Sequence, residues 1–285
     1  MRPDHKTRVG GVRGRSKPAR NSETSGDRLL GVLSLFTVDE PEWTVEAAAK
    51  RLRISNPTAY RYFRSLTGVG LISPSSRAGY VLGPAIIEMD REIRICDPML
   101  NAARDVMSDL IQFAAEGSVI LLCRIFRDRV ICIHQVPGRG PQIPVSYERG
   151  RPMPLFRGAT SRIVLAFLPP RTLKAIYERQ RKEIKSAGLG ESWEVFKTNL
   201  SMLRRAGVCV TRGEIDPGRV GIAAPVFDEN ETVLGSLTFV LPARRADETL
   251  IGRLVPLTIA GAREIERAMT TRPAAGVRPK ISAVK

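Results

Sequence analysis

Thr58, Tyr60, Arg61 and Arg64 are the side chains of this sequence whose types and spacing point most directly to chemistry. They fall on one side of the stretch Ile54–Thr67, which we expect to be a helix. Hydroxyl and guanidinium groups donate hydrogen bonds to phosphates and base edges, and a helix that carries them fits the major groove of DNA. Charged faces also occur on ordinary solvated helices, so this stretch alone leaves both interpretations open.

The other side of this stretch is apolar and would hold the helix against a core. Four residues recur there at the spacing i, i+3, i+4 and i+7, namely Ala59, Tyr62, Phe63 and Leu66. We expect Asn56 to cap the helix and Pro57 to stand at its first position, where a missing N–H costs nothing.

Two earlier stretches repeat this apolar spacing, and a ribbon with a polar tip follows. The first begins at Gly26 and the second after Thr44, which can cap it. Their apolar residues are Leu29, Val32, Leu33 and Phe36, and then Val45, Ala48, Ala49 and Leu52. Residues 71–82 read as a short β-ribbon around Ser73–Gly79. Together these elements predict a winged helix-turn-helix domain over residues 26–83.

Charge is distributed unevenly over this domain. Residues 50–83 contain six basic side chains and no acid, whereas residues 26–49 contain one arginine and five acids. The basic part includes the second helix, the third helix and the wing, as a DNA-facing surface requires, and we expect the remaining surface to be acidic. The residues that we predict to contact DNA are Arg51, Arg53, Asn56, Thr58, Tyr60, Arg61, Arg64 and Arg77.

Both ends of the chain are basic. Residues 1–25 hold seven Lys or Arg against two acids and almost nothing apolar, so we expect a disordered basic arm. Such an arm either follows DNA phosphates or only keeps the protein in solution. Residues 273–285 should form a short basic disordered tail.

The composition is that of a soluble globular protein. The chain has 285 residues, of which 43% are hydrophobic, and its net charge of +16 suggests a polyanionic partner. It lacks an apolar run of about 18 residues and the apolar core of a signal peptide, so we expect a cytoplasmic protein without a membrane segment. Cys96, Cys123, Cys132 and Cys209 show no metal-ligand spacing, and we interpret them as core residues, with oxidant sensing by one of them left open.

Residues 84–97 predict a linker helix, and residues 98–272 a second domain. Ile86, Met89 and Ile93 form an apolar stripe on the linker helix that packs either on a partner chain or on its own domain. Beyond it, helices alternate with strands that include two hairpins, at 118–136 and 221–241. Residues 150–160 are expected to form a loop that leads into a helix at Ser161, and a further helix is expected at 170–185. This order predicts an α+β fold in which helices cover an antiparallel sheet.

Several sequence blocks carry a family resemblance. They are TVEAAAKRLRISNPTAYRYFRSL, GYVLG (Gly79–Gly83), RGRPMPLFRGATSRIVLAFLP (Arg149–Pro169) and DPGRVGIAAPVFDENETVLGSLTFVLP (Asp216–Pro242). With these blocks in this order, the chain resembles IclR-type (isocitrate lyase regulator) bacterial transcriptional regulators. The resemblance implies a GAF-like effector-binding domain without a cofactor and a homodimer or homotetramer. We expect such a dimer to place its two recognition helices in successive major grooves of a pseudo-palindromic double-stranded DNA operator.

The same resemblance implies where a small-molecule effector binds. The corresponding residues here are Gly158, Ala159, Thr160, Arg162, Thr211, Gly221, Thr238 and Val240. Relatives that bind very small keto acids tend to have Asp, Cys and two Ser at the last four positions, so we expect a different and bulkier effector. The residues themselves suggest a carboxylate site, formed by N–H groups at the start of the helix at Ser161 with Arg157 and Arg162 nearby. The alternative is an ordinary helix cap with Arg162 on the surface.

Two rival functions remain at this stage. The sequence offers few candidate catalytic residues for an enzyme. Its only histidines are His5 and His134, and no nucleophile, metalloprotease or P-loop motif occurs. A nonspecific architectural DNA-binding protein would need only the basic arm and tail, which leaves the second domain without a purpose. We therefore predict a transcriptional regulator controlled by a small, carboxylate-bearing metabolite.

Overall fold

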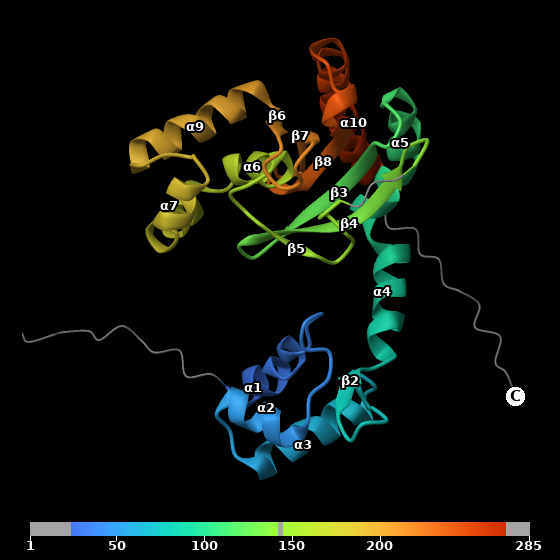
Figure 1. Ribbon diagram of the computed structural model, residues 1–285, viewed down its shortest axis with the longest axis vertical. Coiled ribbons are helices and arrows are strands. Elements are labelled where there is room, and N and C mark those ends of the chain that lie inside the picture. The colour runs from blue at the N-terminus through green and yellow to red at the C-terminus, as the bar shows by residue number, and fades with distance from the viewer. Residues whose placement is uncertain (1–23, 142–144, 272–285) are drawn as a thin grey trace, which may run out of the picture. The chain divides into compact units, whose positions relative to one another are not determined.

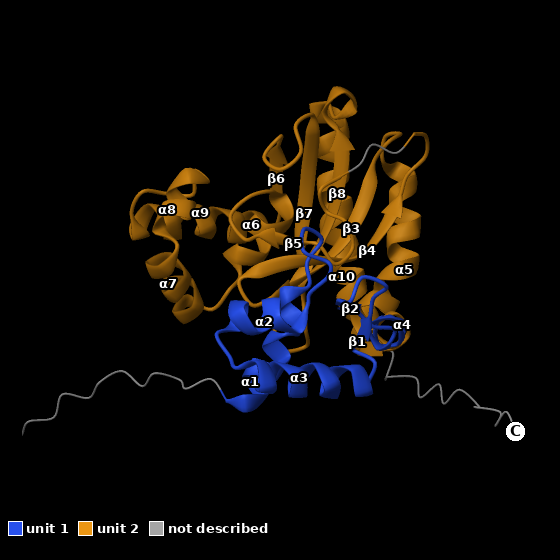
Figure 2. Ribbon diagram, turned by 60° about the horizontal axis from the view of Figure 1, so that its bottom comes forward, with its two compact units in different colours: residues 1–91 blue, residues 92–285 orange. Residues whose placement is uncertain are grey.

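The computed structural model describes residues 24–141 and 145–271. The chain divides into two compact units between Arg91 and Glu92 (Figure 2). The predicted tail and nearly all of the predicted basic arm lie outside the described residues. The end of the arm is an exception, because Thr24 caps the first helix and Ser25 begins it.

The first unit contains the predicted helices and ribbon. Its elements are α1 (Ser25–Gly31), a 3-10 turn (Leu33–Leu35), α2 (Val45–Leu52), α3 (Asn56–Gly68), β1 (Ile72–Pro74) and β2 (Tyr80–Leu82). The two strands pair antiparallel, with Ile72 opposite Leu82. The apolar faces of the helices meet in one core, in which Phe63 is 1% exposed and packs edge-on against Tyr80. The winged helix-turn-helix predicted from the sequence is therefore present.

Two details of this unit differ from the prediction. The first helix ends at Gly31, and its predicted continuation toward Phe36 is a 3-10 turn. The cap of α3 is Ser55 and not Asn56, because the Ser55 carbonyl accepts the first helical hydrogen bond, from the Ala59 N–H. Asn56 is the first residue of the helix, and Pro57 follows it.

The helix α4 (Ala85–Cys96) spans the division between the units. The helices that follow are α5 (Pro98–Leu110), α6 (Ala159–Ala166), α7 (Pro170–Arg179), α8 (Arg181–Ser186), α9 (Trp193–Ala206) and α10 (Glu248–Thr271). The strands are β3 (Val119–Phe126), β4 (Arg129–Pro137), β5 (Pro152–Pro154), β6 (Cys209–Arg212), β7 (Arg219–Phe227) and β8 (Val233–Pro242). Short 3-10 turns at Ile111–Phe113 and Ala243–Arg245 complete the unit.

The strands form one six-stranded sheet in the order β5-β4-β3-β8-β7-β6 (Figure 1). Every neighbouring pair is antiparallel. One face packs on α5 and α10, and the other on α6, against which α9 packs in turn. Along β3, Leu121 and Cys123 belong to the core under α6, whereas Ile120 and Leu122 belong to the core under α5 and α10. The predicted α+β fold with an antiparallel sheet is confirmed.

Three local predictions in this unit were wrong. The helix expected at 170–185 is two helices, because Gln180 leaves the helical conformation at φ −129° and ψ 34°. The segment expected to be a loop before Thr160 contains β5, whose two prolines fit an edge strand. α6 begins at Ala159, two residues before the predicted start. Within the described ranges, no helix has the length and hydropathy needed to cross a membrane.

Candidate functional site

The outward face of α3 presents the predicted DNA contacts in the expected way. Ala59, Tyr62, Phe63 and Leu66 are buried, which turns the opposite side of the helix to solvent. The side chains that we predicted to contact DNA are all exposed except Thr58, which is half-buried and bonded to the Ser55 hydroxyl. Arg61 also lies over the Tyr62 ring, with its guanidinium carbon 5.7 Å from the ring centroid.

The turn between α2 and α3 holds Arg53 in an unusual conformation. This residue ends α2 with φ 56°, in the left-handed region that favours glycine. A side chain retained there costs about 1 kcal/mol relative to glycine. Arg53 and its neighbour Arg51 are exposed, so the turn presents two cations beside the start of α3.

Two acids lie against the elements predicted to face DNA, which corrects the expectation that acids and bases occupy separate surfaces. Glu46, in the first turn of α2, accepts a hydrogen bond of 2.5 Å from the Tyr60 hydroxyl on α3. Glu42 accepts one from Ser75 in the wing. The Tyr60 hydrogen bond lowers the pKa of the Glu46 carboxyl, and Glu46 in turn raises the pKa of the Tyr60 phenol. The acidic and basic residues are thus separated along the sequence but not in space, because α2 packs on α3.

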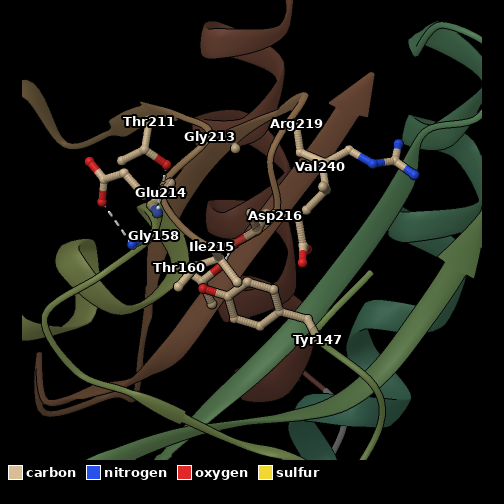
Figure 3. A pocket seen from close by; sticks show the side chains of 13 residues that line it. Tyr147, Gly158, Thr160, Thr211, Gly213, Glu214, Ile215, Asp216, Arg219 and Val240 are labelled. Carbon is tan, nitrogen blue, oxygen red and sulfur yellow. Dashed lines mark hydrogen bonds between the residues drawn. The ribbon is translucent and has the colours of Figure 1, made fainter. Parts of the chain in front are cut away.

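A pocket opens at the start of α6 in the second unit (Figure 3). The empty space inside it and at its open mouth is about 310 Å³ in total. The residues around it are Tyr147, Gly158, Ala159, Thr160, Thr211, Gly213, Glu214, Ile215, Asp216, Arg219, Gly221, Thr238 and Val240. All the predicted effector residues are thus brought together except Arg162. Tyr147 and the segment from Gly213 to Arg219, which forms one wall, were not predicted from the sequence.

The strands β6, β7 and β8 position the polar floor of the pocket. Thr211 stands opposite Gly221, and Gly221 stands opposite Val240, so one row of residues crosses the three strands. The lack of a side chain at Gly221 leaves room for Ala159, whose Cβ would be 3.2 Å from a Cβ at that position. On the neighbouring row, Thr238 accepts a hydrogen bond of 3.1 Å from the buried Thr160 hydroxyl.

The chain itself already occupies the N–H groups that begin α6. The Gly158 N–H donates to Oε2 of Glu214 at 2.9 Å, and the Ala159 N–H donates to Oγ1 of Thr211 at 3.0 Å (Figure 3). Glu214 also forms an ion pair with Arg162, with 2.9 Å between Oε1 and Nη1. Both N–H groups of the carboxylate site expected from the sequence thus have hydrogen-bond partners within the chain.

The two arginines expected near this carboxylate site point elsewhere. Besides its ion pair with Glu214, Arg162 donates to the carbonyl oxygens of Phe156 and Ala187. Arg157 donates to the Ser186 carbonyl and does not line the pocket. Arg162 therefore acts on the pocket through Glu214, whereas Arg157 joins the turn before α6 to the end of α8.

Two buried hydroxyls beside the pocket have no hydrogen-bond partner among the described residues, those of Tyr147 and Ser161. Tyr147 is 4% exposed and lines the pocket. Burial raises the pKa of its phenol, so the group is a neutral hydrogen-bond donor at ordinary pH. Its hydroxyl lies 2.5 Å from the place that a Cβ on Gly158 would take.

Family models match both units. The model described as "Bacterial transcriptional regulator IclR C-terminal" matches residues 97–267, and the "IclR helix-turn-helix domain" matches residues 25–75. The chain belongs to the IclR family. It is accordingly a DNA-binding transcriptional regulator, as the sequence blocks indicated.

Curated relatives of this IclR-family chain are also named as regulators. The HTH-type transcriptional regulator KipR of Bacillus subtilis is 24% identical over 77% of this chain and 86% of its own length. The Pca regulon regulatory protein of Pseudomonas putida is 22% identical over 85% of this chain and 82% of its own length. These names indicate regulation and no catalytic family.

Solved IclR structures share the fold. An IclR regulator from Silicibacter superposes with a TM-score of 0.72 at 17% identity, covering 86% of this chain and 96% of its own. An IclR homologue from Microbacterium hydrocarbonoxydans, crystallised with 4-hydroxybenzoate, superposes with a TM-score of 0.65 at 20% identity. That match covers 87% of this chain and all of the homologue.

The histidine that the structure describes, His134, does not line the pocket. His134 is half-buried in β4, and burial lowers the pKa of its imidazole. His5 lies outside the described residues. Among residues 24–141 and 145–271, no group of three or more His, Cys, Asp or Glu side chains could hold a metal ion.

Proposed function

We propose that this regulator binds a pseudo-palindromic operator as a homodimer or homotetramer and that a small organic acid in the α6 pocket modulates this binding. The pocket carries the proposal, because it combines a helix N-terminus, threonine hydroxyls and the unpartnered phenol of Tyr147. Concave sites with a few convergent polar groups are the usual form of ligand pockets. This proposal gives the second unit a task that an architectural DNA-binding protein would not need.

The proposed DNA contacts are the exposed residues of α3 with the flanking cations. Thr58, Tyr60, Arg61 and Arg64 would read the major groove, and Arg51, Arg53, Asn56 and Arg77 would hold the phosphates on either side. Arginine is the usual reader of guanine, since its two donors match O6 and N7 of that base. Arg61 is our choice for this role.

The effector would be larger than the smallest keto acids. Val240 lines the pocket where relatives that bind very small keto acids tend to have Ser, which suits a ligand with an apolar part. The homologue crystallised with 4-hydroxybenzoate has a ligand with a carboxylate and a hydroxyl, two groups that the polar residues of this pocket could also bind. An aromatic or similar hydroxy acid is therefore our first choice for this chain.

The linker helix supports the proposed oligomer. Met89 and Ile93 of α4 are 53% and 52% exposed and lie on one side of the helix, together with the half-buried Ile86. Such a face is stabilised when a second copy covers it. Sedimentation velocity should give a dimer or tetramer, and Ile93→Glu should shift it toward monomer.

Two measurements test the regulatory function. Footprinting of the DNA that flanks the gene should find a protected pseudo-palindrome, and binding to it should survive salt that removes binding to random DNA. A thermal-shift screen of small acids should then find compounds that stabilise the protein and change operator affinity. If salt weakens binding to the operator and to random DNA equally, the architectural alternative is favoured. Chemical turnover of a compound would favour an enzyme.

A further inference from the structure

The best anion position in the pocket is occupied by a carboxylate of the chain itself. One oxygen of Glu214 accepts the Gly158 N–H at the start of α6, and the other pairs with the Arg162 guanidinium, both at 2.9 Å. A helix N-terminus together with a guanidinium is a favourable combination for binding a carboxylate. Glu214 thus stands where a ligand carboxylate would gain most.

The unpartnered phenol of Tyr147 points to a missing ligand at the same place. Its hydroxyl approaches the Gly158 turn, is nine-tenths buried or more, and lacks an acceptor among the described residues. A buried donor left without an acceptor destabilises a protein by about 1–3 kcal/mol. A bound molecule with an oxygen acceptor would remove this penalty, whereas Glu214 does not.

The segment that carries Glu214 is attached at separate points. It connects β6 to β7, and glycines in the left-handed region bound it, Gly213 with φ 65° and Gly218 with φ 75°. Asp216 accepts hydrogen bonds from the N–H and the hydroxyl of Ser146, so it holds the segment independently of Glu214. The Glu214 side chain can therefore leave α6 while Asp216 keeps the segment in place.

We propose that Glu214 is a built-in competitor of the effector. Its carboxylate holds the anion position in the ligand-free protein, and the carboxylate of an organic acid displaces it from Gly158 and Arg162. This inference rests on the effector pocket proposed above and adds a selection rule. An acid with a second oxygen that accepts from Tyr147 gains enough to displace Glu214, whereas a neutral analogue leaves Glu214 bound.

Calorimetric titration of the full-length protein tests this rule with 4-hydroxybenzoate, benzoate and neutral 4-hydroxybenzamide as probes. Glu214→Gln removes the competing charge and should bind both acids at least about tenfold more tightly, equivalent to about 1.4 kcal/mol. Affinity for the amide should not change. Glu191→Gln is the matched control, because it removes one acid from an exposed ion pair with Lys185 and should bind every probe as the wild type does.

Hydrogen exchange gives a readout that does not depend on the probe. Without ligand, a peptide that contains Gly158 and Ala159 should exchange faster in Glu214→Gln than in the wild type, because the carboxylate contact is weakened. Glu214→Asp, whose shorter side chain cannot hold both partners, should behave in the same way and replaces Glu214→Gln if that variant does not fold.

The outcomes separate this inference from the pocket itself. If the wild type binds an acid and Glu214→Gln binds it equally or more weakly, Glu214 is not a competitor, but the effector pocket remains. Weaker binding of the amide to Glu214→Gln than to the wild type would show that Glu214 is a ligand-binding group, which also overturns the inference. If neither protein binds either acid, both the inference and the proposed acid pocket are wrong.

Discussion

The hydroxyl of Tyr60 on α3 donates a 2.5 Å hydrogen bond to Oε1 of Glu46 on α2. The proposed DNA-reading helix is therefore tied to the preceding helix by an outward-facing side chain as well as by its buried face. Tyr60 is 52% exposed, so this bond lies where DNA would approach.

The Tyr60 to Glu46 hydrogen bond should make stability depend on pH in a defined direction. The hydrogen bond lowers the pKa of the Glu46 carboxyl below the usual 4.5. Its contribution to the stability of the fold is therefore complete above that pH and is lost as the pH falls through the lower pKa of the folded state. Tyr60→Phe should therefore melt below the wild type at neutral pH, and the gap should close in acid. Melting curves from about pH 7 to about pH 3 measure it. With Glu46→Gln as background, the Tyr60 substitution should show no such pH dependence, and a constant gap would contradict the assignment.

Arg61→Ala should weaken operator binding by about 1–3 kcal/mol and relax the preference at one base pair, if Arg61 reads a guanine. Competition binding with single-base operator variants measures both effects. Arg205→Ala removes an exposed arginine of the other unit and should change neither. Equal losses on operator and random DNA would instead make Arg61 a phosphate contact.

Two glycine substitutions should have opposite effects on stability. A Cβ at Gly235 would lie 1.8 Å from the carbonyl oxygen of Cys123 on the neighbouring strand, so Gly235→Ala should destabilise the second unit by more than about 3 kcal/mol. Gly252 lies on an exposed part of α10 with nothing within 4 Å of its Cβ position, so Gly252→Ala should stabilise it by about 0.5–1 kcal/mol. Urea unfolding of both variants measures the change in the free energy of unfolding. A change of the same sign in both variants would contradict this prediction.

Thiol labelling should find one reactive cysteine in the native protein, Cys96, because it alone of the four is exposed. Burial raises the pKa of Cys209 to about 12 and also raises that of Cys123. The Cys123 hydrogen bond lowers the pKa of Cys132, yet Cys132 is fully enclosed. Mass spectrometry after brief alkylation should show one adduct per chain, none in Cys96→Ser, and four after denaturation. A native adduct on Cys132 would show that reagents reach the sheet.

The sequence predicted elements better than it predicted their ends. Regular apolar spacing placed α3, because Ala59, Tyr62, Phe63 and Leu66 all had to be buried together. The cap was wrong because Ser55 and Asn56 both suit that position, and only the backbone shows which carbonyl accepts from Ala59. β5 was missed because a strand of three residues with two prolines has no alternating pattern.

The pocket could be predicted in part. The family resemblance placed Gly158, Thr211 and Thr238 correctly around one cavity, although no pattern within the chain would have done so. Glu214 could not be placed, since it stands in a segment without periodicity. Its reach to α6 depends on the register of β6 on β7, which pairs Arg212 with Val220. The composition of the segment, two acids between two glycines, was the only signal available.

The alternation along β8 has an evolutionary consequence. Thr238 and Val240 face the pocket, whereas Leu237, Phe239 and Leu241 between and beside them complete the core under α5 and α10. The proposed ligand preference and the folding of the sheet therefore depend on alternating residues of one strand. A substitution at position 238 or 240 can change what the pocket accepts without disturbing the apolar core behind the sheet. If the proposed effector binds here, single substitutions at these two positions should change the response of this regulator while its fold persists.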